Sequence, residues 1–335
     1  MILLIGIIVA GVFLTYSPII ESANVNMHME DGEIVLDIYA GYSSKDIHIL
    51  MFEGSEEWKK VEEVIIFSDI SIFSDISNSY PFITKKAVAD FTMNMQNTMR
   101  IMGSNVNVLS VGFEDLFSVI EDVDDAKGKA LIVLTGILPS TVFNGSDGVL
   151  IDWISAGGTM LWFGSPLGNY QGGSSAINDS IKFQLSAWGT SGLVYNGQPG
   201  ETASSPGPKA ELIGHQYNHI SNGLYVAEVE TLGGVSLGWE ESGITSLAVL
   251  PLGEGYVFVF GGEMTRGKTS MNAAAHMLSA PWGAMDITFS ESVHLEGKET
   301  HEMTLLPEAP RVFVYVFDSC PMPTFGQSQM FLLAQ

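Results

Sequence analysis

Cysteine and basic residues are both scarce in this sequence of 335 residues. A single cysteine, Cys320, excludes a disulfide within the chain and any zinc or iron–sulfur site built from several cysteines. Only 14 lysines and arginines stand against 38 aspartates and glutamates, which gives a formal net charge of -24. Because proteins bind nucleic acid through clustered basic side chains, we expect no nucleic-acid partner.

The acidic residues do not follow the pattern of a cation site. Their densest cluster, Glu121, Asp122, Asp124 and Asp125, lacks the D-x-D-x-D-G spacing of a calcium loop. An excess of one charge sign keeps a secreted or surface protein soluble, and we interpret the acidic composition in that way. Hydrophobic residues make up 46% of the sequence, which is enough to fold most of the chain around a core.

Cofactor motifs are also missing. No G-x-G-x-x-G opens a predicted helix, and the glycine-rich stretch 168–173 is not followed by the Lys-Ser/Thr pair of a phosphate-binding loop. His215 and His219 have the spacing that places two metal ligands on one face of a helix. Gly214 and Asn218 favour a loop there, so we interpret the pair as polar loop histidines. We predict no cofactor and no metal, and His215 and His219 are the candidate ligands if a metal is bound.

The amino terminus is a long apolar stretch without charge. Residues 1–20 contain no charged side chain, and their length matches the ~20 residues that a helix needs to cross a bilayer. The first basic residue is Lys45, so we expect the amino end in the cytoplasm and the body of the chain outside. We predict a membrane-anchored protein with an extracellular body, or a secreted one, although Glu21-Ser22-Ala23 is a poor cleavage site. A buried core helix is the alternative.

Two tripeptides match the acceptor pattern for N-glycosylation. Asn144-Gly145-Ser146 and Asn178-Asp179-Ser180 both lie in turn-rich stretches. We therefore predict Asn144 and Asn178 as glycosylation sites of an exported protein.

Apolar runs predict strands and helices along most of the chain. Partial alternation in 33–40 and 47–53 predicts a small β-hairpin, and 312–317 predicts a strand near the carboxy terminus. Between these ends, continuous apolar runs typical of buried strands alternate with segments of helical period. The strands are expected at 64–67, 105–111, 130–134, 159–163, 224–229, 246–250 and 255–260, and the helices at 83–102, 149–156 and 271–280.

This order of elements is typical of parallel β-α-β units. The predicted fold class is α/β: an open, mostly parallel sheet flanked by helices, with small β segments at both ends. The predicted domains are a transmembrane anchor or signal (1–20), a small β segment (24–61), an α/β domain (62–284) and a carboxy-terminal β segment (285–335).

Ligands of an open α/β sheet collect at the carboxyl ends of its strands. Asp69, Gly136, Ser165 and Asn169 follow three of the predicted strands, so we expect them near one rim of the sheet. They are the candidates for a ligand-binding rim, without an assigned reaction.

Several motifs between about Val64 and Gly283 follow one another in an order known from a large family. They are Gly103-Ser104-Asn105-Val106 before a strand, LIVLTG at 131–136, IDWISAGGTMLWF at 151–163, NHISNGL at 218–224 and PLGEGYVFVFG at 251–261. This part, about two-thirds of the chain, resembles the class I glutamine-amidotransferase-like fold, especially its ThuA-like extracellular relatives. The resemblance implies a flavodoxin-like sheet. With its apolar amino terminus and acidic, glycine-rich body, the chain also resembles surface proteins of archaea.

The residue that carries catalysis in those amidotransferases is missing here. Their strand-to-helix elbow holds a cysteine in a pattern like G-x-C-x-G, whereas the matching stretch 164–168 has Pro166 at that place. Proline offers neither a nucleophile nor a backbone N–H to an oxyanion, which argues against a glutaminase. Ser165 is the candidate nucleophile that stays open, with His219 or His215 as its base. We lean towards a protein without catalytic activity.

Three functions are compatible with these features. The leading hypothesis is a non-catalytic cell-surface binding or assembly protein, held at the membrane by residues 1–20 and built on a degenerate amidotransferase-like domain. Its partner would be a cell-surface protein or a glycan, and self-association stays open. The first alternative is an extracellular hydrolase or carbohydrate-active enzyme that uses the rim residues. The second is a structural subunit of a surface layer or filament, whose β segments pair between copies.

Overall fold

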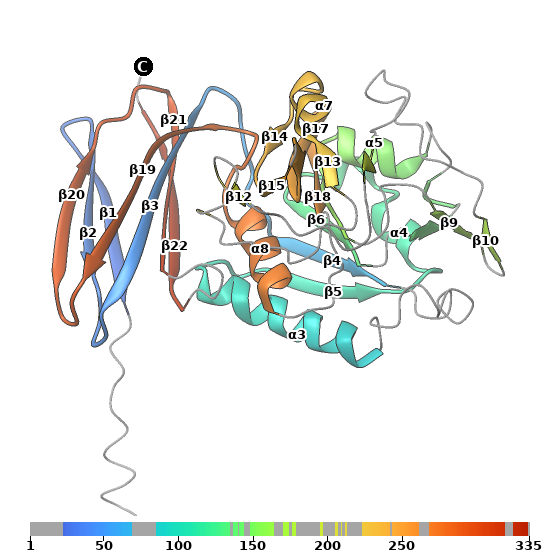
Figure 1. Ribbon diagram of the computed structural model, residues 1–335, viewed down its shortest axis with the longest axis horizontal. Coiled ribbons are helices and arrows are strands. Elements are labelled where there is room, and N and C mark those ends of the chain that lie inside the picture. Colours follow the sequence, from blue (N-terminus) through green and yellow to red (C-terminus); the bar gives the residue numbers. More distant parts are fainter. Residues whose placement is uncertain are drawn as a thin grey trace, which may run out of the picture.

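The computed structural model gives the chain two parts that lie side by side, a β-sandwich and a sheet covered by helices (Figure 1). Both ends of the described chain lie in the sandwich. The structure describes residues 23–68, 85–134, 148–163, 223–241, 243–260, 268–318 and 324–333, with short pieces at 137–139, 141–143, 170–173, 176–178, 195–196, 205–206, 209 and 212.

The sandwich consists of two antiparallel sheets that bury one shared core. The first sheet has the order β1 (Asn24–Glu30), β2 (Glu33–Tyr39), β20 (Thr300–Leu305). The second has the order β19 (Asp286–Leu295), β3 (Lys45–Gly54), β21 (Arg311–Asp318), β22 (Gly326–Leu332). Alternation explains the first sheet, since every second residue of β2 is buried and its neighbours are partly exposed.

β3 and β21 depart from this alternation because both of their faces are covered. On β3, Ile47 and Ile49 join the core between the two sheets, whereas Leu50 and Phe52 join the core of the helical part. The residues of β21 divide in the same way, with its valines on one side and its aromatic residues on the other. A continuous apolar run is the pattern that a strand needs when both faces are buried.

The helical part is built on a sheet of seven strands. Its order is β14 (Val235–Ser236), β17 (Leu247–Leu252), β18 (Gly255–Phe260), β8 (Thr159–Trp162), β6 (Lys129–Val133), β4 (Glu63–Phe67), β5 (Asn107–Val111). The five strands from β18 to β5 are parallel to one another. β17 is antiparallel to β18, and β14 is antiparallel to β17.

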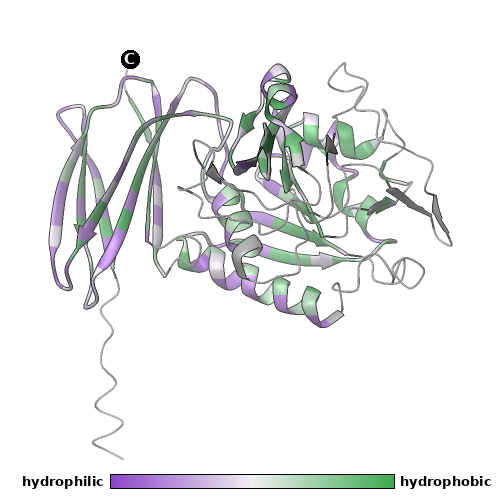
Figure 2. Ribbon diagram, in the orientation of Figure 1, coloured by the Kyte–Doolittle hydropathy of each residue, from purple (hydrophilic) through white to green (hydrophobic). Residues whose placement is uncertain are grey.

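Helices cover both faces of this sheet. Alternate strand residues point to opposite faces, so Ile66 packs with the core under α3 (Lys85–Ile101) and α8 (Lys268–Ser279), whereas Ile65 packs with the opposite core. Three shorter helices and a 3-10 turn cover that opposite face: α4 (Leu116–Ile120), α5 (Val149–Ser155), α7 (Val226–Thr231) and η1 (Val123–Asp125). Figure 2 shows hydrophobic and hydrophilic residues in turn along α3, as expected for a helix that covers a core with one face.

α8 connects the two parts because it is buried between them (Figure 1). Trp282, just after this helix, meets Phe52 of the sandwich edge-on, with ring centroids 5.2 Å apart. Its indole N–H donates to the carbonyl of His276 at 2.8 Å, which fixes the end of the helix. The sandwich and the helical part therefore share the core around α8, in addition to the cores that each has of its own.

Two small sheets complete the described chain. One has the order β10 (Ala176–Asn178), β9 (Tyr170–Gly173), β7 (Ile137–Pro139). The other has the order β11 (Tyr195–Asn196), β13 (Gly223–Tyr225), β16 (Ile244–Thr245), β15 (Trp239–Glu241), β12 (Ser205–Pro206).

The predicted fold class is wrong for the chain as a whole. The described part of the chain has more strand than helix and forms five sheets, not one helix-flanked sheet of the flavodoxin or amidotransferase kind with minor β additions. The two end segments were expected as small β pieces, and together they build the sandwich. The boundaries of the predicted domains remain predictions.

Two local predictions are also wrong. β2 and β3 do not form a hairpin, because β2 pairs with β1 and β20 while β3 pairs with β19 and β21 in the opposite sheet. The segment 224–229 was expected as a strand, but its apolar residues belong to the short β13 and then to the first turns of α7. Short apolar runs fit either structure, and here the partners in space decide.

Candidate binding groove at the carboxyl ends of β4 and β5

A groove of about 550 Å³ lies where β4 and β5 end. The two strands are parallel and in register, with Phe67 opposite Val111, so their carboxyl ends coincide. Ser68 follows β4 directly and Ser110 lies one residue before the end of β5. The groove therefore occupies the edge of the sheet at which open α/β sheets bind ligands.

The other wall of the groove is the first half of α3. This helix turns Phe91, Met95 and Met99 into the core, and an adjoining stripe faces the groove with Val88, Ala89, Thr92, Met93 and Gln96. The Thr92 hydroxyl donates to the carbonyl of Val88 at 2.9 Å, which leaves its oxygen as an acceptor. Met93 is 58% exposed, so its apolar side chain is accessible at the groove.

The chemistry of the groove is polar but uncharged. Its described lining offers the hydroxyls of Ser68, Thr92 and Ser110 and the amide of Gln96, next to the apolar Val88 and Met93. Hydroxyls and amides both donate and accept hydrogen bonds, so they suit a ligand that does the same. No described lining residue has the acidic or basic side chain that proton transfer requires.

The residues predicted as site residues from the sequence fall outside this description. Asp69, Gly136, Ser165, Asn169, His215, His219 and Asn144, and also Pro166 of the elbow, lie outside the described residues. Asn178 lies in β10, of which only the backbone is described. Of the predicted rim, Asp69 is next in the sequence to the groove residue Ser68.

Sequence reasoning missed the groove residues of α3. Thr92 and Gln96 are four apart, and they flank the apolar residues Phe91 and Met95 that define the helix. A polar pair beside a buried stripe resembles any solvated helix face, so only the position of β5 marks it as a wall. The nearest sequence signal was the expectation of ligands at strand ends.

A second polar cluster lies in the core between α8 and β21. The Nδ1 atom of His276 lies 2.9 Å from the hydroxyl of Tyr315, and the imidazole ring meets Phe317 with centroids 4.9 Å apart. Burial lowers the pKa of His276 to about 3, with His48 lowering it further and Asp318 acting in the opposite direction. The imidazole is fully buried and neutral near pH 7, as expected for a structural group.

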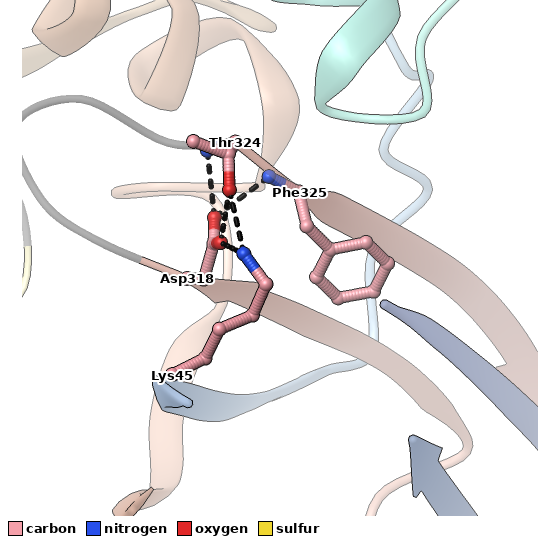
Figure 3. A network of polar contacts seen from close by, with 4 residues as sticks. All are labelled: Lys45, Asp318, Thr324 and Phe325. Atoms are coloured by element: carbon pink, nitrogen blue, oxygen red, sulfur yellow. Dashed lines mark hydrogen bonds and ion pairs between the residues drawn. The ribbon is translucent and has the colours of Figure 1, made fainter. Parts of the chain in front are cut away.

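Asp318 forms a third cluster at the end of β21 (Figure 3). One carboxylate oxygen accepts from the backbone N–H groups of Thr324 and Phe325, both at 2.7 Å. The other accepts from the ammonium group of Lys45 at 2.6 Å and from the Thr324 hydroxyl at 2.5 Å. The carboxylate is 1% exposed, so this network ties β3, β21 and the entry to β22 together.

Neither a membrane span nor a metal cluster occurs in the part of the chain that the structure describes. No helix there has the length and hydropathy to cross a bilayer, and the predicted anchor, residues 1–20, lies outside that part. No group of three or more His, Cys, Asp or Glu side chains is placed to hold a metal ion in the same ranges.

No protein family model matches the sequence, and no curated protein matches it. Several solved structures are similar to the chain at a low level. A cold-adapted β-galactosidase from Rahnella sp. R3 has 10% identity and a TM-score of 0.38, over 82% of this chain and 41% of that enzyme. An exo-β-1,4-mannosidase from Opitutaceae bacterium strain TAV5 has 15% identity and a TM-score of 0.34, over 67% and 35%. A β-galactosidase from Bacillus circulans sp. alkalophilus has 10% identity and a TM-score of 0.33, over 78% and 36%.

The predicted resemblance to class I glutamine amidotransferases is wrong. No family model supports it, and the described strands form several sheets, including a β-sandwich, where the resemblance implies one helix-flanked sheet. The chain spans between about a third and two-fifths of the length of these enzymes. The motifs quoted for the resemblance are short strand and helix patterns with glycines between them, and many folds place such patterns in the same order.

Proposed function

We propose that this chain is an extracellular carbohydrate-active protein that binds a neutral saccharide in the groove between α3 and the ends of β4 and β5. The observation that carries the proposal is the uncharged polar lining of that groove. Three hydroxyls and one amide suit the hydroxyl groups of a sugar, and Val88 and Met93 suit its C–H faces.

The charge of the protein supports a neutral ligand over an anionic one. The chain carries a formal net charge of -24, which repels phosphates and other anions as they approach. No lysine or arginine is among the described residues that line the groove. A saccharide needs no charged partner, because its hydroxyls are satisfied by neutral donors and acceptors. The extracellular location belongs to the same proposal, and it rests on the acidic composition and the apolar residues 1–20.

Hydrolysis of the bound saccharide is the second candidate function. Asp69 directly follows the groove residue Ser68, and Asp75 follows in the repeat FSDISIFSDIS. Most glycosidases act through a pair of carboxyl groups, one as acid and one as nucleophile or base. The sequence next to the groove therefore supplies the residue types that this reaction needs.

Binding is tested with the full chain and a panel of neutral sugars: galactose, glucose, mannose and their β-linked disaccharides. Saturation-transfer NMR finds the binders, and calorimetry gives the affinity. We expect at least one sugar to bind, and Gln96→Ala to weaken it about fivefold, the effect of losing one hydrogen bond of ~1 kcal/mol. Asn97→Ala is the matched control, since Asn97 lies exposed on the same helix and does not line the groove.

Two results would overturn the saccharide site: no binding across the panel, or equal effects of Gln96→Ala and Asn97→Ala. Hydrolysis is tested separately with p-nitrophenyl β-galactoside, β-glucoside and β-mannoside. If the chain is a hydrolase, Asp69→Asn abolishes release of p-nitrophenol while sugar binding persists. Binding without hydrolysis in the parent protein would leave the binding function alone.

A further inference from the structure

A cavity of about 400 Å³ opens between the two sheets of the sandwich. It lies at the end of β3, beside the start of β19 and the end of β20, and it is separate in sequence and space from the groove at β4 and β5. Its lining combines an apolar wall with two carboxyl groups, those of Glu53 and Glu308, and no basic residue is among its described lining residues.

A β-bulge shapes one side of this cavity. In the pairing of β19 with β3, Ile287 lies opposite Phe52 and Phe289 lies opposite Met51, so Thr288 is an extra residue without a partner. Its side chain donates a hydrogen bond to the Glu53 carboxylate. Bulges redirect a side chain and occur frequently next to functional sites.

Glu53 is a buried carboxylate that stays charged. Glu53 is 7% exposed, and one oxygen of its carboxylate accepts from the backbone N–H groups of Glu308 at 2.5 Å and Ala309 at 2.8 Å. Burial acts to raise the pKa of Glu53, yet the hydrogen bonds from Thr288, Ala309 and Glu308 together lower it below its ordinary value. These donors are dipoles, and they fix the carboxylate without cancelling its charge.

The two carboxylates of the cavity have no cationic partner among the described residues. None of the ion pairs found there involves Glu53 or Glu308. By contrast, the other buried carboxylate of the sandwich, Asp318, is paired with Lys45 at 2.6 Å. Glu53 is buried and Glu308 is exposed, and a buried charge without a counter-charge attracts a cation more strongly than an exposed one does.

Apart from Thr288 and Thr304, the rest of the lining is apolar, and it favours one kind of cation. Met51 and Leu305 are buried, Phe289 is half-buried, and Leu306 is 67% exposed at the mouth. A hydrated metal ion gains nothing from these side chains, and three donors already occupy the Glu53 carboxylate. A cation with a hydrocarbon arm satisfies both halves of the lining.

We propose that this cavity binds a small organic ammonium ion, with its charged group between Glu53 and Glu308 and its hydrocarbon arm against Phe289, Leu305 and Leu306. The site is independent of the saccharide groove. It gives the protein a second ligand, of the opposite chemical character to a neutral sugar.

Calorimetry of the full chain with n-pentylammonium chloride tests the site, with 1-pentanol as the neutral ligand of matched length. The titration is run at about 0.15 M salt, which screens general attraction to the acidic surface. We expect saturable binding of one pentylammonium per chain and at least tenfold weaker binding of pentanol. Glu308→Gln should weaken the ammonium at least fivefold and leave pentanol unchanged, and Leu306→Ser should weaken both.

Glu302→Gln is the control for surface charge, because Glu302 is exposed, as Glu308 is, but lies on β20 and does not line the cavity. It should leave the affinity for pentylammonium unchanged. The proposal is overturned by absence of saturable binding, by equal binding of pentanol, or by equal effects of Glu302→Gln and Glu308→Gln. Circular dichroism confirms that each variant is folded, so a lost affinity reports on the site. None of these results bears on sugar binding.

Discussion

Asp318 shows how one side chain joins strands that are distant in the sequence. Its carboxylate accepts from β3 through Lys45 and from the segment that opens β22 through Thr324 and Phe325. All of this occurs at a site that is 1% exposed, where an uncompensated charge is costly. An exposed ion pair next along β3, Asp46 with His294 at 2.7 Å, provides the comparison.

Asp318→Ala should lower the free energy of unfolding by about 3 kcal/mol, because Lys45 and two backbone N–H groups lose their acceptor. Urea unfolding followed by circular dichroism measures the change. Asp46→Ala removes the exposed pair and should cost less than about 1 kcal/mol. Equal losses in the two variants would contradict the importance of burial in this network.

His276 should make the protein less stable as the pH is lowered, and this loss should begin at a higher pH than the titration of the carboxyl groups. Its pKa is lowered to about 3 in the folded chain, chiefly by burial, so only the unfolded chain takes up this proton between pH 6.5 and 5. The unfolded state then binds more protons than the folded state. The free energy of unfolding therefore decreases as the pH is lowered, by up to about 1.4 kcal/mol per pH unit. Urea midpoints measured from pH 7.5 to 5 give the slope, which His276→Gln should reduce.

His294 provides the control of opposite sign. It is exposed, and its hydrogen bond with Asp46 raises its pKa, so its charged form stabilises the folded state at low pH and this contribution is lost as pH rises. His294→Gln should therefore make the loss of stability on acidification steeper. A flatter slope in this variant would show that the assignment of the two histidines is wrong.

At the scale of elements, the packing of α5 on β18 depends on glycine. A Cβ atom at Gly255 would collide with the carbonyl oxygens of Ile154 and Gly158. The neighbouring Gly158 in turn lies under the ring of Trp153, which is fully buried. Trp153 and Trp162 are both fully buried, and a glycine makes room for one of them.

Gly255→Ala should lower the melting temperature. The new Cβ atom meets two backbone carbonyls, which cannot turn aside as a flexible side chain could, so the backbone must move. We expect a loss of about 2 kcal/mol, in the range that overpacking causes. Gly112→Ala is the matched control, since nothing lies within 4 Å of a Cβ atom there and its φ is not positive. It should be neutral or stabilise slightly through the unfolded state. Calorimetric unfolding of both variants checks the difference.

The sequence predicts elements better than it predicts their partners. Buried strands such as β6 and β8, and helices α3 and α5, were expected near their observed limits because their apolar periodicity is local. The sandwich was not, because β3 pairs with β19 and β21 across the whole helical part. The groove was approached only through the rule for strand ends, since Thr92 and Gln96 carry no signal of their own.

For the whole molecule, the shared core around α8 predicts cooperative unfolding. Phe52 and Tyr315 of the sandwich belong to the same buried cluster as Met95 of α3 and Leu278 of α8. Neither part can lose its structure without exposing this surface, so both should unfold together. Near-ultraviolet dichroism and hydrogen exchange of β1 and β2 amides should give coincident transitions in urea. Two separate transitions would show that the parts are energetically independent.

The pairing of both ends of the described chain in one sandwich has a consequence for synthesis on the ribosome. β1, β2 and β3 emerge before their partners β19 to β22, which follow only after about 230 further residues. At ordinary elongation rates this delay lasts roughly 10 to 50 s. During that time β3 presents two unpaired edges and two apolar faces, the features that promote aggregation of nascent strands. Slow translation of the middle of the chain would therefore lower the yield of folded protein unless a chaperone covers these strands.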